Sequence, residues 1–285
     1  MCIRDRAYTY FNANSLSEDG SSASSGNVFA ISTRIAPIYP MYIRDGEGNI
    51  MIDKNGYKMY DYGDGENGGL GRPFMSGSNA YSATMLNENN AEGNAINAMG
   101  FAELRFLKDF KFTWTSSVNV DETRSTAFTN PYYGQYASQN GMLYKYHTRN
   151  LAYNHQQLLN WKRSFGSHNL DVMLGHESYR YKYYYLYASK SNMFDPTNHE
   201  LAGAITENGN NSYTTDYNTE GYFGRVQYDY NEKYFLSGSY RRDASSRFHP
   251  DHRWGNFWSA GAAWIISKED FFDVPWINLL KLKAS

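Results

Sequence analysis

Metal chemistry is the first candidate that the sequence offers, because two histidines lie close together. His249 and His252 flank Pro250-Asp251. A metal site built from such a pair needs at least one further ligand held at a fixed geometry, and neither a nearby third ligand nor a helix accompanies these residues. We therefore expect an exposed hairpin loop at this place, and no metal site.

Carboxylate chemistry is the second candidate. Asp171 and Glu177 have the residue types of a glycosidase acid–base pair, and such enzymes hold their two carboxyl groups on either side of the scissile bond. Both residues, however, alternate with Leu170, Val172 and Leu174 in a strand pattern. Polar side chains on the wet face of a strand explain them without catalysis.

The sequence shows neither the motif of a nucleophilic serine nor that of a phosphate-binding loop. The sequence contains no Gly-x-Ser-x-Gly elbow, the turn that exposes a hydrolase serine, and no glycine-rich phosphate loop. Asp243 lies among Arg241, Arg242 and Arg247, a cluster that we interpret as cross-strand ion pairs. We predict that the chain is not an enzyme and that it uses no cofactor.

A glycine-rich, acidic stretch over residues 43–79 raises the question of calcium. It contains Asp45-Gly-Glu-Gly-Asn and Asp64-Gly-Glu-Asn-Gly-Gly. The twelve-residue loop of an EF-hand, with its terminal glutamate, is absent. A solvated loop is the favoured interpretation, although the sequence leaves calcium binding by a loop open.

An aromatic cluster provides the only candidate binding residues. Within Asn130-Pro-Tyr-Tyr-Gly-Gln-Tyr, the side chains of Tyr132, Tyr133 and Tyr136 combine flat apolar rings with polar hydroxyls. Such rings stack on sugars or on peptide side chains. We predict these three as substrate-binding residues; packing against other loops, or contact with a partner protein, is the alternative.

Strands must position these residues, and the clearest strand lies over 110–120. Its two faces carry Phe110, Phe112, Trp114, Val118 and Val120 on one side and Lys111, Thr113, Thr115, Ser117 and Asn119 on the other. Because successive side chains of a strand point to opposite faces, this alternation predicts one apolar and one wet face. The same rule puts Tyr222, Val226, Tyr228 and Tyr230 opposite Arg225, Gln227 and Asp229.

Further strands recur along the chain, and several are long. We expect them at 94–107, 110–121, 147–163, 167–190, 217–230, 233–245, 254–267 and 279–285. Short helices are predicted near 29–36 and 80–89. Several strands exceed the roughly 9–11 residues that cross a bilayer at a tilt, whereas strands of globular proteins most often have about five or six.

The connections alternate between tight turns and long polar loops. Turns are expected at Lys108-Asp109, Ser164–Gly166 and Asn231–Lys233, and loops at 122–146, 191–216 and 246–253. In outer-membrane barrels the short turns face the periplasm and the long loops face outside. The link 268–278 is a longer exception on the turn side. We predict an all-β fold: an antiparallel up-and-down meander that forms a partial, unclosed segment of a large transmembrane β-barrel.

Composition agrees with this prediction and narrows it. No run of about 18 apolar residues exists, which excludes helical membrane spans. Aromatic residues make up 17% of the chain, with 27 Tyr against 16 Phe and 6 Trp, and tyrosine suits interfacial belts. The net charge of −2 argues against a nucleic-acid partner. A soluble extracellular glycan-binding β-domain remains the alternative reading of so much tyrosine.

The stretch from Gly221 onward resembles one family closely. It contains Tyr222-Phe-Gly-Arg, Tyr234-Phe-Leu, Arg241-Arg-Asp-Ala-Ser-Ser-Arg-Phe and Arg253-Trp-Gly. This ordered series is similar to the C-terminal half of the barrel in SusC/RagA-type TonB-dependent outer-membrane transporters, with Ala244 where that family usually has glycine. Weaker matches lie at Arg34–Tyr42, Phe106–Phe112, His168–Glu177 and Leu280–Ser285.

The resemblance implies a function in nutrient import. Transporters of this kind are large barrels closed by a plug, capped by a SusD-like surface lipoprotein and driven by the TonB complex acting on the plug. They import oligosaccharides or peptides through the outer membrane of Gram-negative, Bacteroidetes-like cells. Another TonB-dependent receptor, for siderophores or vitamins, is the alternative within the same fold.

The same resemblance implies that the chain is part of a longer protein. Met1–Arg6 leads directly into Tyr8-Thr-Tyr-Phe with no signal peptide, which an exported protein needs. We expect residues 1–285 to be an internal piece of one barrel domain, open at both ends. The plug, through which TonB acts, and any N-terminal extension then lie outside these residues, and outer-membrane lipid is the surrounding partner.

Overall fold

The computed structural model describes residues 2–16, 28–69, 71–134 and 136–285. Nine strands form one sheet in the described residues. Their bounds are β1 Cys2–Asn14, β2 Glu88–Phe106, β3 Phe110–Thr129, β4 Met142–Phe165, β5 His168–Met193, β6 Ala204–Tyr230, β7 Tyr234–Ser245, β8 Trp254–Ile265 and β9 Lys281–Ala284. Every strand pairs antiparallel with the next one in the chain. The predicted all-β, unclosed meander is confirmed.

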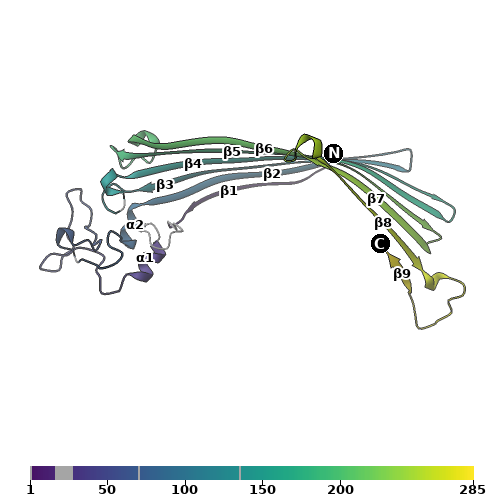
Figure 1. The fold of residues 1–285 in the computed structure, drawn as a ribbon, viewed down its shortest axis with the longest axis horizontal. Coiled ribbons are helices and arrows are strands. Elements are labelled where there is room, and N and C mark those ends of the chain that lie inside the picture. The colour runs from purple at the N-terminus through teal and green to yellow at the C-terminus, as the bar shows by residue number, and fades with distance from the viewer. Residues whose placement is uncertain (1, 17–27, 70, 135) are drawn as a thin grey trace.

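The sheet arches over one side, and the short helices lie on that side at one end (Figure 1). The helices are α1 Val28–Arg34 and α2 Ala80–Leu86, close to the two predicted ranges. Single 3-10 turns are η1 Glu66–Gly68, η2 Ala137–Gln139, η3 Leu201–Gly203, η4 Pro250–His252 and η5 Ile266–Lys268. None of the helices in the described residues is long and apolar enough to cross a membrane.

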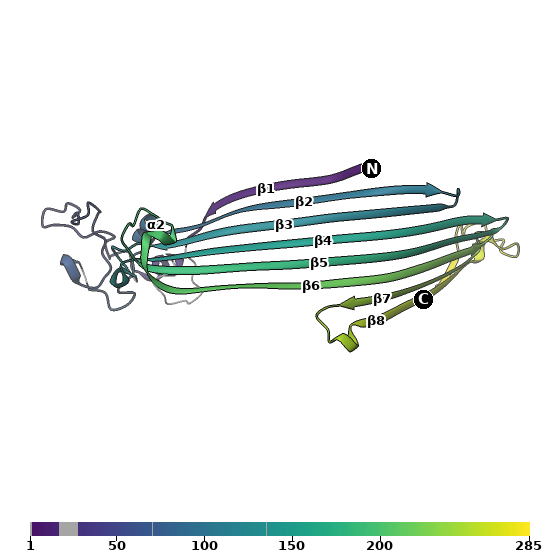
Figure 2. The same cartoon turned by 90° about the horizontal axis from the view of Figure 1, so that it is seen from above.

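Turns and loops gather at opposite ends of the sheet, as predicted (Figure 2). The hairpin after β2 is closed by Leu107 and Lys108, both with positive φ (50° and 59°), and that after β6 by Asn231 and Glu232, both with φ 53°. Backbone of this handedness matches the twist of paired strands, which permits tight connections. The described residues of 15–87 and 130–141 and the loop 194–203 lie at the other end. The loop 246–253 lies partway along the sheet, because β7 and β8 are short and Ser245 is paired with Thr219 in the middle of β6.

Several strands are longer than the sequence predicts. β3 and β4 stay paired from Phe110↔Trp161 to Thr129↔Met142, which reduces the predicted loop 122–146 to residues 130–141. Likewise, β5 and β6 reduce the predicted loop 191–216 to residues 194–203. The strand β1 lies outside all the predicted ranges. The predicted strand at 279–285 is present only as the short β9.

Register divides the side chains between the two faces. Val118 is paired with Tyr153, and Arg225 with Met173, so that each pair shares a face. The segment 28–87 lies on the concave side (Figure 1), and there Tyr62 lines a cavity of about 370 Å³ together with Tyr144. Tyr144 and every residue that register puts on its face therefore point to the concave side.

The convex face carries a continuous apolar band beside the short turns. Its members are Ile96, Leu104, Phe106, Phe110, Phe112, Trp114, Val118, Val120, Leu151, Leu159, Trp161, Leu170, Val172, Leu174, Val226, Leu236, Tyr240 and Trp258. Many of these side chains are exposed, and Trp258 is 80% exposed. Polar residues inside the band bond to each other: the Ser116 hydroxyl lies 2.9 Å from Nδ1 of His155.

Aromatic rings line the band where it meets the turns. Phe110 stacks on Phe106 at 5.4 Å, and Tyr234 stacks between Tyr230 at 6.3 Å and Trp264 at 6.2 Å. Farther along the same strands the convex face becomes polar. Glu122 and Arg124 follow on β3, Arg149 and His147 on β4, and Arg180 and Lys182 on β5.

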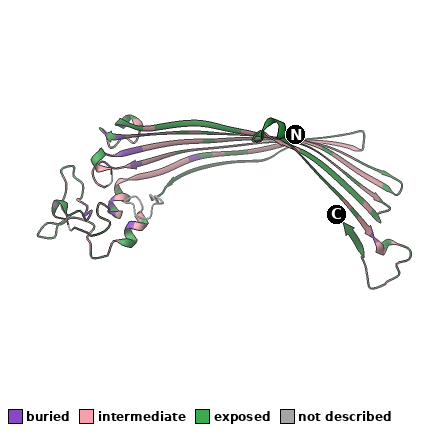
Figure 3. Ribbon diagram, in the orientation of Figure 1, coloured by how far each residue is buried: buried purple, intermediate pink, exposed green. Residues whose placement is uncertain are grey.

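Buried residues gather at the loop end, where Figure 3 shows them in purple. One cluster unites Phe128, Leu143, Met193 and Ala204, with Leu201 of η3 packed against it. In the described residues the sheet has no apolar core along its length, because the apolar band faces outward. A soluble β-domain would bury such a face, so the structure opposes that alternative.

Candidate functional site

The loop that carries Tyr132, Tyr133 and Tyr136 is fixed by one buried asparagine. Asn130 is 2% exposed, and its Oδ1 accepts hydrogen bonds from the backbone N–H of Tyr132 (3.0 Å) and Tyr133 (2.9 Å). Its own side-chain amide donates to Asn87 Oδ1 at 2.7 Å. Asparagine commonly organises a turn in this way, and here it also ties the turn to the start of β2.

Two of the three predicted tyrosines, Tyr132 and Tyr133, pack on the segment 28–87, whereas the Tyr136 hydroxyl lies beside that of Tyr144 on β4. Tyr132 lies 4.7 Å from the ring of Tyr57, and Tyr133 stacks on Tyr62 at 5.8 Å. The hydroxyl of Tyr133 donates to Asp53 Oδ2 at 2.7 Å. These contacts belong to the loop-packing interpretation, and all three side chains keep part of their surface exposed. Their role in ligand binding stays a prediction.

The surroundings shift the pKa values of Tyr132, Tyr133 and Asp53. Burial, and then the bond to Asp53, raises the pKa of Tyr133. Burial, and then the contact with Tyr57, raises the pKa of Tyr132 to about 12. Burial on its own raises the pKa of Asp53, but the hydrogen bonds that it accepts from Tyr133 and from backbone N–H groups lower it overall. At neutral pH the phenols are therefore protonated and Asp53 is ionised.

A much larger tyrosine surface adjoins this cluster, and sequence reasoning missed it. We call it the tyrosine wall; its members are Tyr144, Tyr146, Tyr179, Tyr181, Tyr183, Tyr185, Tyr187, Tyr213 and Tyr217. All nine side chains point to the concave face. The signal was present in the sequence, because five of them occupy alternate positions of β5.

Ring contacts join the wall across three strands. On β6, Tyr213 lies 5.0 Å from Tyr185, and Tyr217 lies 5.2 Å from Tyr181. On β4, Tyr146 lies 5.1 Å from Tyr187. The hydroxyls of Tyr144 and Tyr136 are 3.5 Å apart, which connects the wall to the predicted cluster.

The cross-strand neighbours of the wall carry no charge. The residues of β4 and β6 opposite Tyr179 to Tyr187 are Tyr146, Thr148, Asn150, Ala152, Asn154, Asn211, Tyr213, Thr215, Tyr217 and Thr219. Tyr181 donates to Asn150 Oδ1 at 2.6 Å. Burial raises the pKa of Tyr179 and Tyr183, so these two phenols stay protonated at neutral pH. Charged groups lie at its margins, with Asp121 opposite Asn150 and Arg247 over the ring of Tyr217 at 4.0 Å.

The predicted cluster of arginines around Asp243 is divided between the faces. On the concave face, Arg241 binds Asp243 at 2.7 Å and Glu177 at 3.3 Å. Arg242 lies on the convex face, over the ring of Trp254 at 4.8 Å. Glu177 is thus an ion-pair partner of Arg241, and Asp171 lies six residues away on the same strand, about 20 Å at the usual rise. That separation is too large for a glycosidase pair.

The histidine pair and the acidic residues of the glycine-rich stretch, which were the candidates for metal binding, lie in turns. His249 and His252 have rings 6.3 Å apart in an exposed turn. Asp45 Oδ1 accepts from the backbone N–H of Glu47 and Asn49, and Asp53 Oδ1 accepts from that of Tyr57. Within the described part of the chain, no group of three or more His, Cys, Asp or Glu side chains could hold a metal ion.

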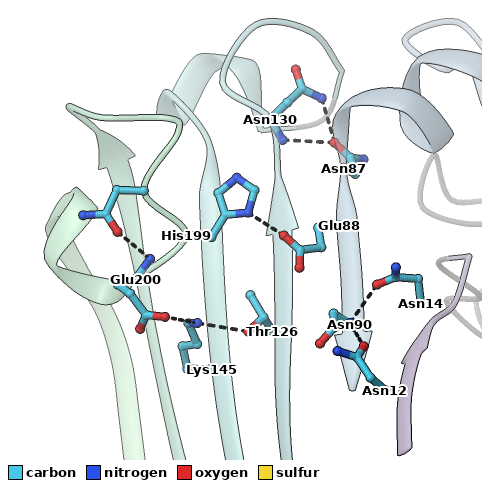
Figure 4. A network of polar contacts seen from close by, with 11 residues as sticks. Asn12, Asn14, Asn87, Glu88, Asn90, Thr126, Asn130, Lys145, His199 and Glu200 are labelled. Atoms are coloured by element: carbon cyan, nitrogen blue, oxygen red, sulfur yellow. Dashed lines mark hydrogen bonds and ion pairs between the residues drawn. The ribbon is translucent and has the colours of Figure 1, made fainter. Parts of the chain in front are cut away.

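A polar network fixes the loop end from the convex side (Figure 4). His199, in the loop before η3, pairs with Glu88 and stacks on Phe128 at 4.0 Å. Lys145 donates to Glu200 at 2.9 Å and to Thr126 at 3.0 Å. The loop 194–203 is therefore folded against the outside of the sheet, while the segment 28–87 occupies the inside.

Comparison with known proteins gives a consistent result. The chain is 33% identical to TonB-dependent receptor P39 of Formosa agariphila over 140 residues, which are 47% of this chain and 13% of that receptor. It is 30% identical to TonB-dependent receptor SusC of Bacteroides thetaiotaomicron over 186 residues, 64% of this chain and 18% of SusC. The resemblance to SusC/RagA-type TonB-dependent receptors is confirmed. No family model matches the chain.

Solved structures of a peptide importer share the fold of this chain. The RagAB peptide transporter superposes with a TM-score of 0.67 at 22% identity, covering 80% of this chain and 25% of that one. The closed-closed state of the RagAB importer gives a TM-score of 0.67 at 23% identity, with 84% and 25% covered. The curated relatives are named as receptors, in agreement with the prediction that the chain is not an enzyme. The chain thus matches only a small part of these receptors, 13% of the length of P39 and 18% of that of SusC.

Proposed function

We propose that this chain is part of the wall of an outer-membrane importer that takes up oligosaccharides or peptides with TonB-derived energy. The convex apolar band is the observation that carries the proposal. On β3 it runs from Phe110 to Val120 and on β4 from Leu151 to Trp161. Each run has about 11 residues, as a tilted strand needs to cross a bilayer. The aromatic row near the turns fits the belt at a membrane surface.

The position of the apolar band indicates which end of the sheet faces the periplasm. The band adjoins the short turns, so these turns lie at the periplasmic surface and the outer halves of β2 to β6 extend beyond the membrane. The concave face, with Lys111, Thr113, Arg225 and Gln227, lines the lumen. Residues 1–285 then belong to one barrel domain in the outer membrane of a Bacteroidetes-like cell.

The partners follow from the same arrangement. TonB acts through a plug that lies outside these residues, and a SusD-like lipoprotein covers the loop end. Tyr132, Tyr133 and Tyr136 lie at that end, beside the mouth of the lumen. Their partly exposed rings support contact with a ligand or with the lipoprotein.

Uptake by intact cells tests the proposal. The gene for the whole receptor is deleted and restored, and uptake of labelled neutral oligosaccharides and of labelled short peptides is measured. We expect uptake of at least one probe to require both the receptor and TonB. The control is the outer-membrane abundance of the restored receptor. Equal uptake of every probe with and without the receptor would refute a role in import.

A further inference from the structure

Cross-strand ring contacts of the tyrosine wall stabilise the sheet, but the wall is not part of the buried apolar cluster. It lies on the concave face, whereas the buried apolar cluster around Leu143 includes residues of the convex face and the strand ends. Lipid contact does not explain it either, since Tyr183 and Tyr185 have the opposite parity to Leu170 and Leu174. Aromatic surface in contact with water is unfavourable.

The position of the tyrosine wall along β5, beyond the apolar band, puts it in the outer part of the lumen. On β5 the apolar band ends at Leu174, and the wall begins at Tyr179. From Tyr179 to Tyr187 the strand extends about 26 Å at the usual rise per residue. The wall therefore lies above the membrane and leads from the loop cluster of Tyr136 toward the Glu177–Arg241–Asp243 ion pairs.

We propose that the tyrosine wall binds a neutral oligosaccharide on its way through the lumen. This inference rests on the proposed import function and selects one of its two substrate classes. Tyrosine rings offer flat apolar faces to the C–H faces of sugars, and their hydroxyls bond with sugar hydroxyls. Thr148, Asn150 and Thr215 lie opposite the wall and add uncharged donors and acceptors.

The lack of charged residues opposite the wall favours neutral oligosaccharides over peptides as its ligands. A short peptide carries two charged ends and often charged side chains, and burying a charge without a partner is costly. All ten cross-strand positions opposite Tyr179 to Tyr187 are uncharged. The marginal Arg247 already covers the ring of Tyr217. A neutral glycan meets no such cost along this surface.

Binding to the purified whole receptor tests the inference, and the chain supplies a matched control. Tyr184 lies between Tyr183 and Tyr185 on β5 but points to the convex face. The probes are maltohexaose, laminarihexaose, xylohexaose and mannohexaose, with a hexapeptide carrying one Lys and one Glu as comparison. Affinity is measured by titration calorimetry in detergent, and outer-membrane abundance is measured for each variant.

We expect at least one hexasaccharide to bind the wild-type receptor. The double variant Tyr183→Ala/Tyr185→Ala should bind it at least about tenfold more weakly, since each lost ring contact weakens binding several-fold. Tyr184→Ala should bind as the wild type does, and Tyr183→Phe/Tyr185→Phe, which keeps the rings, should lose less than the alanine pair. If the double alanine variant does not reach the membrane, Tyr183→Ala alone is compared with Tyr184→Ala.

Three results would overturn the inference. They are binding of none of the five probes, equal effects of the Tyr183 and Tyr184 replacements, and binding of the hexapeptide alone. The third leaves the import function intact and assigns the wall to peptides or to a protein contact. Failure of the import function is recognised separately, because the receptor then causes no TonB-dependent uptake in cells.

Discussion

Tyr133 connects the predicted binding cluster with the rest of the fold. Its hydroxyl bonds the Asp53 carboxylate at 2.7 Å and its ring stacks on Tyr62 at 5.8 Å. A hydrogen bond to a charged group stabilises more than a neutral one. The residue therefore holds the segment 28–87 against the loop between β3 and β4, whatever contact it makes with a ligand.

Replacing Tyr133 with Phe should loosen that segment. The change removes the bond to Asp53 and keeps the ring, for an expected loss of about 1 kcal/mol in local stability. Faster proteolysis or hydrogen exchange within residues 41–64 of the whole receptor is the measurement. Tyr60→Phe is the control, because Tyr60 packs on the Tyr133 ring at 5.5 Å without forming the Asp53 bond. Equal protection in Tyr133→Phe and the wild type would show that the bond contributes nothing.

The binding role of the cluster needs a separate variant. Replacing Tyr132, Tyr133 and Tyr136 together with Ala should lower ligand uptake by the whole receptor while its surface abundance stays unchanged. Unaltered uptake would remove the three from the binding site. A fall in abundance would assign them to loop packing, for which the contacts with Tyr57 and Asp53 already provide a basis.

Residue parity was predicted correctly from sequence, whereas the tyrosine wall was missed. Phe110 and Lys111 were assigned to opposite faces correctly, because apolar and polar types alternate there. Around Tyr183 to Tyr185 the two faces carry the same residue type. The contrast that marks a lumen-facing position is lost in such a run. Which of Tyr183 and Tyr184 faces the lumen is then given only by their parity with Leu170 and Leu174 and by the register.

Among the elements, sequence located nearly all of β5 and most of β2 and β4, but it missed the outer parts of β3 and β6. Apolar and polar residues alternate along a strand only where one of its faces meets an apolar environment. Beyond Val120, strand β3 continues as Asp121-Glu-Thr-Arg-Ser-Thr, which is polar on both faces and reads as a loop. The backbone nevertheless stays paired with β4 to Thr129, because strand neighbours continue on both sides.

The proposed faces predict different outcomes for two adjacent residues of β6. Val226 lies on the convex band, and Gln227 points to the concave face. Val226→Arg should impair assembly of the whole receptor, since an arginine near the bilayer midplane costs about 2–4 kcal/mol. Gln227→Arg should assemble normally. The measurement is the heat-modifiable, folded fraction in outer membranes, and the reverse order of the two variants would show that the faces are assigned wrongly.

At the scale of the molecule, the described sheet is open. β1 and β9 are its edge strands, and β7 pairs only with the part of β6 from Thr219 to Tyr230. Free strand edges and a broad exposed apolar face both promote association. Residues 1–285 expressed alone should therefore aggregate in buffer without detergent. A monodisperse monomer that melts cooperatively in such buffer, seen by light scattering and circular dichroism, would count against the proposed membrane face.

The proposed function requires that this sheet crosses an outer membrane with its turns inside and its loops outside. Labelling with a membrane-impermeant maleimide tests it most directly, in the whole receptor with Cys2 replaced by Ser. Ser138→Cys lies in the loop after β3, and Lys108→Cys in the turn before it. We predict labelling of Ser138→Cys in intact cells and of Lys108→Cys only after the outer membrane is permeabilised. Labelling of Lys108→Cys in intact cells, with Ser138→Cys protected, would contradict the account.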